Sequence, residues 1–174
     1  LETGNTLLLL DQNDEAINDF KYILNIDKNN VDALVNLGSS MLKINKPFEA
    51  LSYFNKSKKL DQKISEIWYL EGMTYLEMNM YYQSIVNYEK ALELEPNNLM
   101  YINALGNNYA LLYSYNKAEE YFDKVLCLDP YDTIALVNKG IIRHHQKDDL
   151  NSIRYFAKAV NILTEDSSKF RKNI

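Results

Sequence analysis

Residues 65–98 read SEIWYLEGMTYLEMNMYYQSIVNYEKALELEPNN, and this stretch decides the fold. Its glycine, Gly72, belongs to a series, because each glycine of the chain stands 34 residues from the next. Glycine inside a helix costs about 1 kcal/mol relative to alanine, so a glycine kept at one phase needs a structural reason. The simplest reason is a repeated element in which two backbones approach closely at that point. The series is Gly4, Gly38, Gly72, Gly106 and Gly140.

Other columns share this period. With each glycine counted as repeat position 8, the repeats are 1–30 (partial, lacking its first four residues), 31–64, 65–98, 99–132 and 133–166. Position 20 always holds alanine or serine, and position 24 always holds phenylalanine or tyrosine. Several independent columns that agree at one period indicate a tandem repeat. Position 20 is Ala16, Ala50, Ser84, Ala118 and Ser152, and position 24 is Phe20, Phe54, Tyr88, Phe122 and Phe156.

The pattern resembles the tetratricopeptide repeat (TPR) family, whose repeats read Trp-x-x-Leu-Gly-x-x-Tyr, then alanine, an aromatic residue, alanine and proline. The chain departs from it where Glu71 and Lys139 replace leucine at position 7 and Arg143 replaces tyrosine at position 11. The resemblance implies an all-α solenoid of helix-turn-helix repeats, a right-handed superhelix forming a single array over 1–174, with 167–174 starting a further or capping helix. The best match is Trp68, Gly72, Tyr75, Ser84, Tyr88, Ala91 and Pro96.

Apolar spacing predicts two helices in each repeat. We expect helix A near 31–44, 65–78, 99–112 and 133–146. We expect helix B near 14–26, 47–60, 81–94, 115–128 and 149–162.

Short polar segments separate the two helices of a repeat, as at Asn45-Lys46-Pro47 and Asn79-Met80. Asn29-Asn30, Asn97-Asn98 and Asp132 stand where they can cap the next helix A. We also expect each glycine to face the small residue at position 20, which lets the two helices pack closely. The aromatic residue at position 24 then fills the space between repeats.

Composition excludes several classes of function. The net charge of −5 provides no polycationic surface, so we expect no nucleic-acid partner. A single cysteine, Cys127, excludes an internal disulfide and a cysteine-based zinc site, and it fits a reducing, cytoplasmic location. The longest aliphatic run, Leu7–Leu10, is far shorter than the roughly 20 apolar residues of a membrane span. Because the sequence begins at Leu1 inside a repeat, secretion stays open.

No catalytic constellation or glycine-rich phosphate loop is evident, so we expect no enzyme activity and no cofactor. His144 and His145 stand near Asp148 and Asp149, a pattern that could indicate a metal. Further ligands at the proper spacing are missing, so we expect no metal and interpret the histidines as solvated or ligand-facing.

The resemblance implies that helix A lines an inner, concave face, where positions 2, 5, 9 and 12 share one side of the helix with 6 and 13 flanking. This face is more apolar than solvent exposure favours, as at a binding surface. Its asparagines could hydrogen-bond a peptide main chain, and the alternative is packing between neighbouring helices A. The predicted peptide-binding residues are Asp32, Val35, Asn36, Ser39, Leu42, Glu66, Tyr69, Met73, Leu76, Met100, Asn103, Asn107, Leu111, Ile134, Val137, Asn138, Ile141, His144 and His145.

We therefore predict a non-catalytic scaffold that binds an extended peptide or a partner helix, of unknown identity, in its concave groove. Two alternatives stay open: a recruiting or targeting arm of a larger enzyme, and a module that self-associates through its end helices. Some TPR proteins hold a terminal carboxylate with a lysine–asparagine–asparagine–lysine–arginine clamp, and neither register of this chain reproduces its full set of cations. The two registers read Leu1, Asn5, Asn36, Glu66, Leu70 and Asn103, Asn107, Asn138, Ser168, Lys172.

Overall fold

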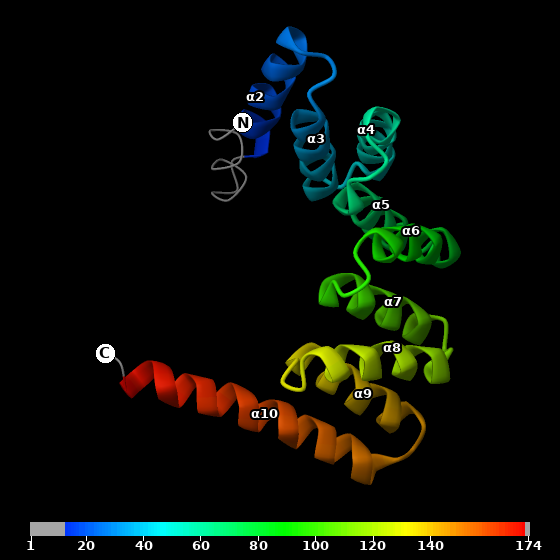
Figure 1. Ribbon diagram of the computed structural model, residues 1–174, viewed down its shortest axis with the longest axis vertical. Helices are drawn as coiled ribbons and strands as arrows, with labels where there is room; N and C mark the ends of the chain where they lie inside the picture. Colours follow the sequence, from blue (N-terminus) through cyan, green and yellow to red (C-terminus); the bar gives the residue numbers. More distant parts are fainter. Residues whose placement is uncertain (1–12, 173–174) are drawn as a thin grey trace. The chain divides into compact units, whose positions relative to one another are not determined.

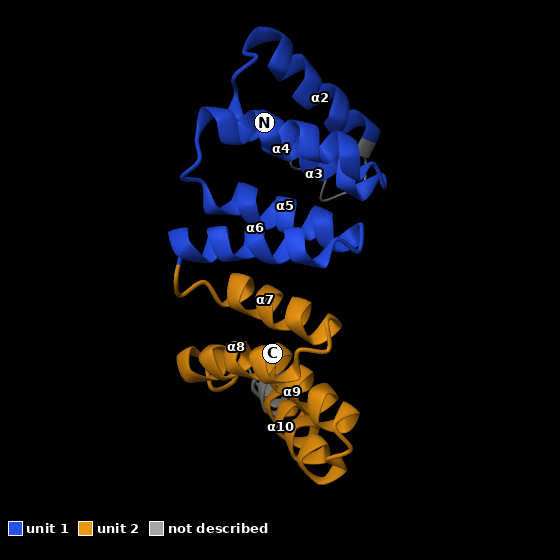
Figure 2. Cartoon of the chain, turned by 90° about the vertical axis from the view of Figure 1, so that its right-hand side faces the viewer, with its two compact units in different colours: residues 1–95 blue, residues 96–174 orange. Residues whose placement is uncertain are grey.

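A computed structural model describes the backbone of residues 13–172 and the side chains of residues 14–164 (Figure 1). The described residues form nine α-helices, and the chain divides into two compact units, unit 1 (residues 1–95) and unit 2 (residues 96–174) (Figure 2). Gly4, Leu7–Leu10 and the start of the first repeat lie outside the described residues. None of the helices in the described part combines the length and the apolar character that a membrane crossing requires.

In unit 1, consecutive helices pack against each other, and α3 also contacts α5. The helices are α2 (Asn13–Ile26), α3 (Val31–Lys43), α4 (Pro47–Leu60), α5 (Ser65–Glu77) and α6 (Tyr81–Leu94). In unit 2, consecutive helices likewise pack together, and α7 also contacts α9. They are α7 (Leu99–Leu111), α8 (Tyr115–Leu128), α9 (Thr133–His145) and α10 (Asp149–Lys172). Through α9, every predicted helix is found with its ends within one residue.

The last helix is longer than expected. Helix B of the last repeat was predicted to end near residue 162, with a further or capping helix starting at 167. Instead α10 continues without a break to Lys172. Pro96 and Pro130 follow the ends of α6 and α8, whereas Thr164 occupies that repeat position in α10, as Lys28 and Gln62 do after α2 and α4. The absence of proline allows α10 to continue but does not by itself cause it, since α2 and α4 end without proline.

Turns and caps follow the local sequence. The side chains of Asn30, Asn98 and Asp132 accept hydrogen bonds from backbone N–H groups in the first turns of α3, α7 and α9, so the predicted caps are confirmed. Each turn between helices A and B contains one residue with φ near +60°, the left-handed conformation that ends many helices. Asparagine, which tolerates this conformation, supplies it at Asn45 and Asn79.

The repeated glycines that the structure describes lie inside helices A, each beneath the aromatic ring of its own repeat. A Cβ atom added to Gly72 would stand 2.5 Å from ring carbons of Tyr88, and one added to Gly38 would stand 2.5 Å from the ring of Phe54. Gly106 and Gly140 meet Phe122 and Phe156 in the same way. We expected the small residue at position 20 to face the glycine, and the nearest atoms belong instead to the aromatic ring at position 24. The flat ring is the closest group because it lies directly on the bare backbone.

Candidate functional site

Neighbouring helices A lie beside each other within each unit, because α3 contacts α5 and α7 contacts α9. The predicted inner-face residues of each unit therefore come from two adjacent helices. Their exposure differs between the units, and this difference decides which of them are available to a partner.

In unit 1 the apolar residues of this face are half-buried. Val35 and Leu42 pack against the core formed by α2, α3, α4 and α5. The ring of Tyr69 lies 5.5 Å from that of Tyr88, centroid to centroid. The packing interpretation therefore accounts for much of this surface. Asn36, Ser39, Met73 and Leu76 are half-buried as well, whereas Asp32 and Glu66 are exposed.

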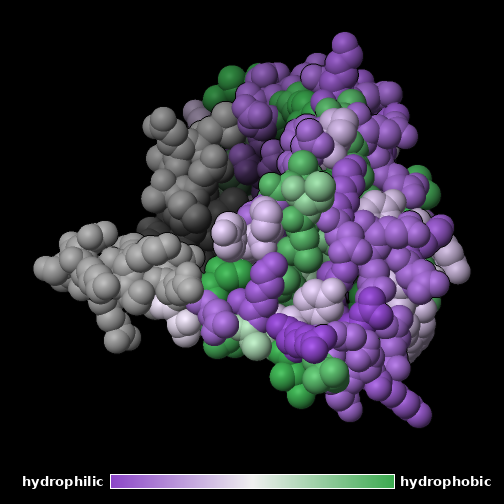
Figure 3. Space-filling model, turned by 60° about the horizontal axis from the view of Figure 1, so that its bottom comes forward, coloured by the Kyte–Doolittle hydropathy of each residue, from purple (hydrophilic) through white to green (hydrophobic). Residues whose placement is uncertain are grey.

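In unit 2 the same repeat positions leave apolar side chains in solvent. Five of them are between 36 and 57% exposed, on two helices that contact each other. Adjacent exposed apolar residues of this kind usually mark a binding surface. Figure 3 shows hydrophobic areas of the molecular surface between hydrophilic ones. The five residues are Met100 and Leu111 on α7, and Ile134, Val137 and Ile141 on α9.

Two asparagines join the helices in the middle of this surface. The side-chain amide of Asn138 donates a hydrogen bond to Oδ1 of Asn107, at 2.7 Å. Both residues are half-buried. Each amide has two N–H donors and one carbonyl oxygen, so this bond leaves one N–H group of Asn138, both N–H groups of Asn107 and the carbonyl oxygen of Asn138 unused. We call the five apolar residues together with Asn107 and Asn138 the α7–α9 face.

Asn103 lies beside this face but is only 7% exposed. Its amide donates to Oδ2 of Asp132, the capping residue of α9, at 3.4 Å. Helical spacing groups Asn103 with the predicted inner-face residues, but the neighbouring helix α9 and its cap residue bury it.

The two histidines lie at the end of α9 and have partners within the protein. Nδ1 of His144 lies 2.9 Å from Oδ1 of Asp149. The ring of His145 stacks on Tyr115, with centroids 5.9 Å apart. Both histidines are exposed, as expected for solvated or ligand-facing side chains.

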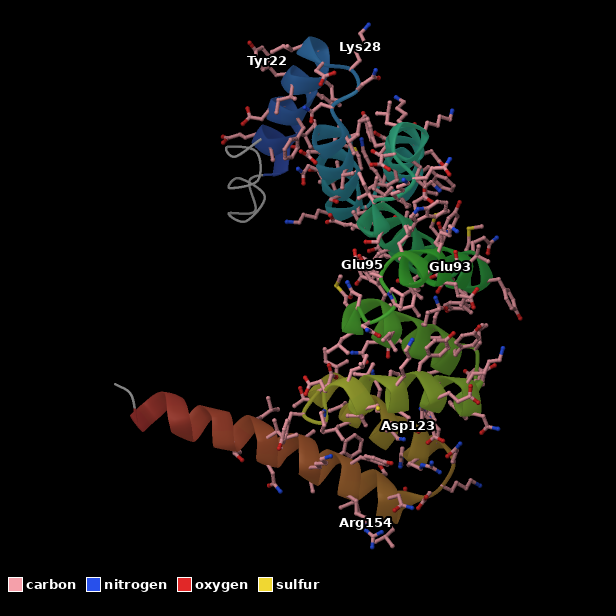
Figure 4. The ribbon with its side chains drawn as sticks, viewed as in Figure 1. Tyr22, Lys28, Glu93, Glu95, Asp123 and Arg154 are labelled. Atoms are coloured by element: carbon pink, nitrogen blue, oxygen red, sulfur yellow. The ribbon has the colours of Figure 1, made fainter. Side chains whose placement is uncertain are left out.

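Ion pairs between helix B and the next helix A were not predicted. Glu71, 2% exposed on α5, pairs with Lys58 of α4, whose Nζ also lies 4.2 Å from the Trp68 ring centroid. Lys139 of α9 pairs with Asp123, which Figure 4 labels on α8, and Arg143 pairs with Glu119 at 2.7 Å. These pairs contain all three departures from the family pattern noted above. These departures were the signal in the sequence that could have indicated the ion pairs. Their partners lie 13 to 24 residues away, so the sequence does not show which residues pair.

Burial raises the pKa of the Glu71 carboxyl above its ordinary value of 4.5, even though Lys58 acts to lower it. Only one carboxylate oxygen bonds Lys58, while Oε1 is buried with no hydrogen-bond partner among the described residues. Desolvation of the charge therefore outweighs the attraction of the lysine.

This pKa predicts a pH-dependent stability. The folded chain binds the Glu71 proton more tightly than the unfolded chain, so this contribution is fully present below pH 4.5 and is lost as pH rises through the higher folded pKa. Glu71→Gln, which cannot ionise, should therefore gain stability relative to wild type as pH rises above 4.5. Urea unfolding of both proteins between about pH 4 and pH 7 measures this difference. A difference that stays constant with pH would contradict the raised pKa.

Comparison with known proteins agrees with the geometry. Residues 65–98 match the family model described as tetratricopeptide repeat. A crystal structure of MamA is similar over 97% of this chain and 98% of that chain, with 23% identity and a TM-score of 0.84. YrrB, titled a TPR protein with an unusual peptide-binding site, matches over 100% of this chain and 90% of its own, with 18% identity and a TM-score of 0.74. PilF of Pseudomonas aeruginosa matches over 92% and 73%, with 18% identity and a TM-score of 0.83. The comparison with curated proteins gave no match to this sequence.

The paired helices with repeated glycine–aromatic contacts define an all-α solenoid of tandem helical repeats. The predicted resemblance to the tetratricopeptide repeat family is confirmed, by the family match at residues 65–98 and by a fold shared with a solved TPR protein.

Proposed function

We propose that this chain is a non-catalytic protein-interaction module and that the α7–α9 face of unit 2 binds an extended peptide. The observation that carries the proposal is the group of five exposed apolar side chains on two contacting helices. Burying these side chains against a ligand removes apolar surface from water, which is the main driving force of association. The corresponding residues of unit 1 are more buried and stay a predicted part of the site.

The asparagine pair supports an extended peptide as the ligand. Asn107 and Asn138 use one donor and one acceptor on each other, and further N–H donors and the carbonyl oxygen of Asn138 are not used by this bond. An extended peptide backbone presents alternating N–H and C=O groups, which match such a pair. Apolar side chains of the peptide would then lie on either side, against Met100 and Leu111 or against Ile134 and Ile141. The peptide-binding title of the similar protein YrrB is consistent with this proposal.

The test uses peptides selected from a random phage-displayed library on the wild-type chain. We expect Ile134→Lys combined with Ile141→Lys to weaken binding of the selected peptides about 30-fold, because two isoleucine side chains that a bound peptide partly covers would contribute roughly 2 kcal/mol. Fluorescence polarisation of labelled peptides measures this change. Both side chains are exposed, so the helices should fold unchanged.

Val86→Lys is the matched control, since Val86 is 63% exposed on α6, outside the helices A. We expect it to leave peptide affinity unchanged. Equal affinity of the wild type and the double variant for every selected peptide would refute binding at the α7–α9 face. Peptides that bind only through unit 1 would give that result.

A further inference from the structure

Two junctions of the described array contain a buried charge, where a junction is the contact between a helix B and the helix A that follows it. At the α4–α5 junction the charge on helix A is negative, since Glu71 pairs with Lys58. At the α8–α9 junction it is positive, since Lys139 pairs with Asp123. Glu71 and Lys139 stand at the same repeat position, and their side chains are only 2% and 5% exposed. The two junctions therefore contain similar ion pairs of opposite polarity.

A charge at this position is not needed for packing. Leu37 of α3 and Leu105 of α7 occupy the same repeat position, and both are buried. Replacing a buried ion pair by well-packed apolar residues is often neutral or stabilising. Stability alone therefore does not account for Glu71 and Lys139. The best-attested use of a buried polar group is to select one pairing of structural elements over the others.

Tandem repeats offer many wrong pairings, because their helices share one pattern and helices of two molecules can meet during folding. If α5 of one molecule packed on α8 of another, Glu71 would lie on the side of α8 that carries Asp123. If α9 packed on α4 of another molecule, Lys139 would lie on the side that carries Lys58. Each wrong pairing would bury a charge beside a like charge and without its counterion, which is strongly unfavourable.

We propose that the opposite polarity of these ion pairs decides which helices pair, so that α4 accepts α5 and rejects α9, and α8 accepts α9 and rejects α5. The second salt bridge of the α8–α9 junction, between Arg143 and Glu119 at 2.7 Å, has the same polarity as the first and increases the distinction. At the other junction, the amine of Lys58 is also held over the Trp68 ring of α5. This device concerns the assembly of the array and does not rest on the proposed function.

The test inverts one junction and leaves the other unchanged. Lys58→Glu combined with Glu71→Lys keeps an ion pair between α4 and α5 but gives it the polarity of the α8–α9 junction. The new charges would attract Lys139 and Asp123, so the wrong pairings are no longer opposed. After rapid dilution from urea over a concentration series, we expect this variant to shift from the wild-type mass to larger species whose share rises with concentration. Size-exclusion chromatography with light scattering measures the masses.

Lys90→Glu combined with Glu93→Lys is the matched control. It has the same composition as the inverted variant, but its salt bridge is exposed on α6 and lies at neither of these junctions. We expect it to refold to the wild-type mass distribution.

A further variant separates lost selectivity from lost stability. It keeps the inverted α4–α5 junction and also inverts the α8–α9 junction, by Lys139→Asp with Asp123→Lys and Arg143→Glu with Glu119→Arg. The two junctions again differ in polarity, so we expect the wild-type mass distribution to return. Inverting the α8–α9 junction alone should produce the larger species, which makes the result independent of how one variant folds.

Two results would overturn the proposal. One is that both singly inverted variants refold to the wild-type mass at every concentration. The other is that inverting the second junction leaves the larger species in place, which would mean that the altered pairs destabilise the chain without affecting which helices pair.

Discussion

Lys58→Met is expected to lower the free energy of unfolding by about 3 kcal/mol at pH 7, because it leaves the buried carboxyl of Glu71 without its counterion. One oxygen of that carboxyl already has no hydrogen-bond partner among the described residues. Removing the lysine takes away the hydrogen bond to the other oxygen and the positive charge that balances the carboxylate. Urea unfolding, followed by circular dichroism, measures the loss.

Removing the carboxyl of Glu71 instead of the amine of Lys58 should lower the free energy of unfolding much less. Glu71→Leu restores the residue that the family places at this position, and Lys58, which is 16% exposed, can extend its amine into water along the Trp68 ring. We therefore expect Lys58→Met combined with Glu71→Leu to recover most of the lost stability. Such a recovery would mean that Lys58→Met destabilises the chain because it leaves a charge buried, and that the ion pair itself contributes little stability.

Lys90→Met is the control, since Lys90 and Glu93 form a salt bridge in which both side chains are largely exposed. Such pairs contribute about 0.5 kcal/mol or less, so this variant should unfold almost as the wild type does. If Lys58→Met were as harmless as Lys90→Met, Glu71 would not be a buried charge that depends on Lys58 at pH 7.

Gly72→Ala is expected to destabilise the chain by about 2 kcal/mol, although alanine is the better helix former. The helix preference for alanine favours the variant by about 1 kcal/mol. Against it, the new methyl group would stand 2.5 Å from two ring carbons of Tyr88, a side chain that is only 1% exposed. Overpacking of a dense core costs about 1–3 kcal/mol, sometimes more, and this ring has little room to move.

Gly140→Ala is the matched comparison, because its methyl group meets the ring of Phe156, which is only half-buried. That ring can shift toward solvent, so the loss should be smaller. A double-mutant cycle with Gly72→Ala and Tyr88→Leu should show that shrinking the ring removes part of the cost of alanine. Additive effects would mean that the glycine is needed for a reason other than contact with this ring.

The sequence did not predict which residues of the candidate site are exposed and which are buried. Val35 and Ile134 both stand on the predicted inner side of a helix A, yet Val35 packs into a core and Ile134 is 57% exposed. Helical spacing determines which side of its own helix a residue occupies. It does not determine how closely the neighbouring helices cover that side. The alternatives of packing and binding therefore had to stay open until the contacts between helices were known.

The sequence by itself determined the repeat, the helices, their caps and the breaks between them. These features depend on backbone geometry and on residues a few positions apart, as with Asn98 capping α7 or Asn79 ending α5. Only the tertiary structure decided that an aromatic ring covers each described glycine, that Glu71 pairs with Lys58, and that α7 and α9 share an exposed apolar surface. Those outcomes depend on which side chains two packed helices bring together, and a repeat pattern leaves that choice to the packing.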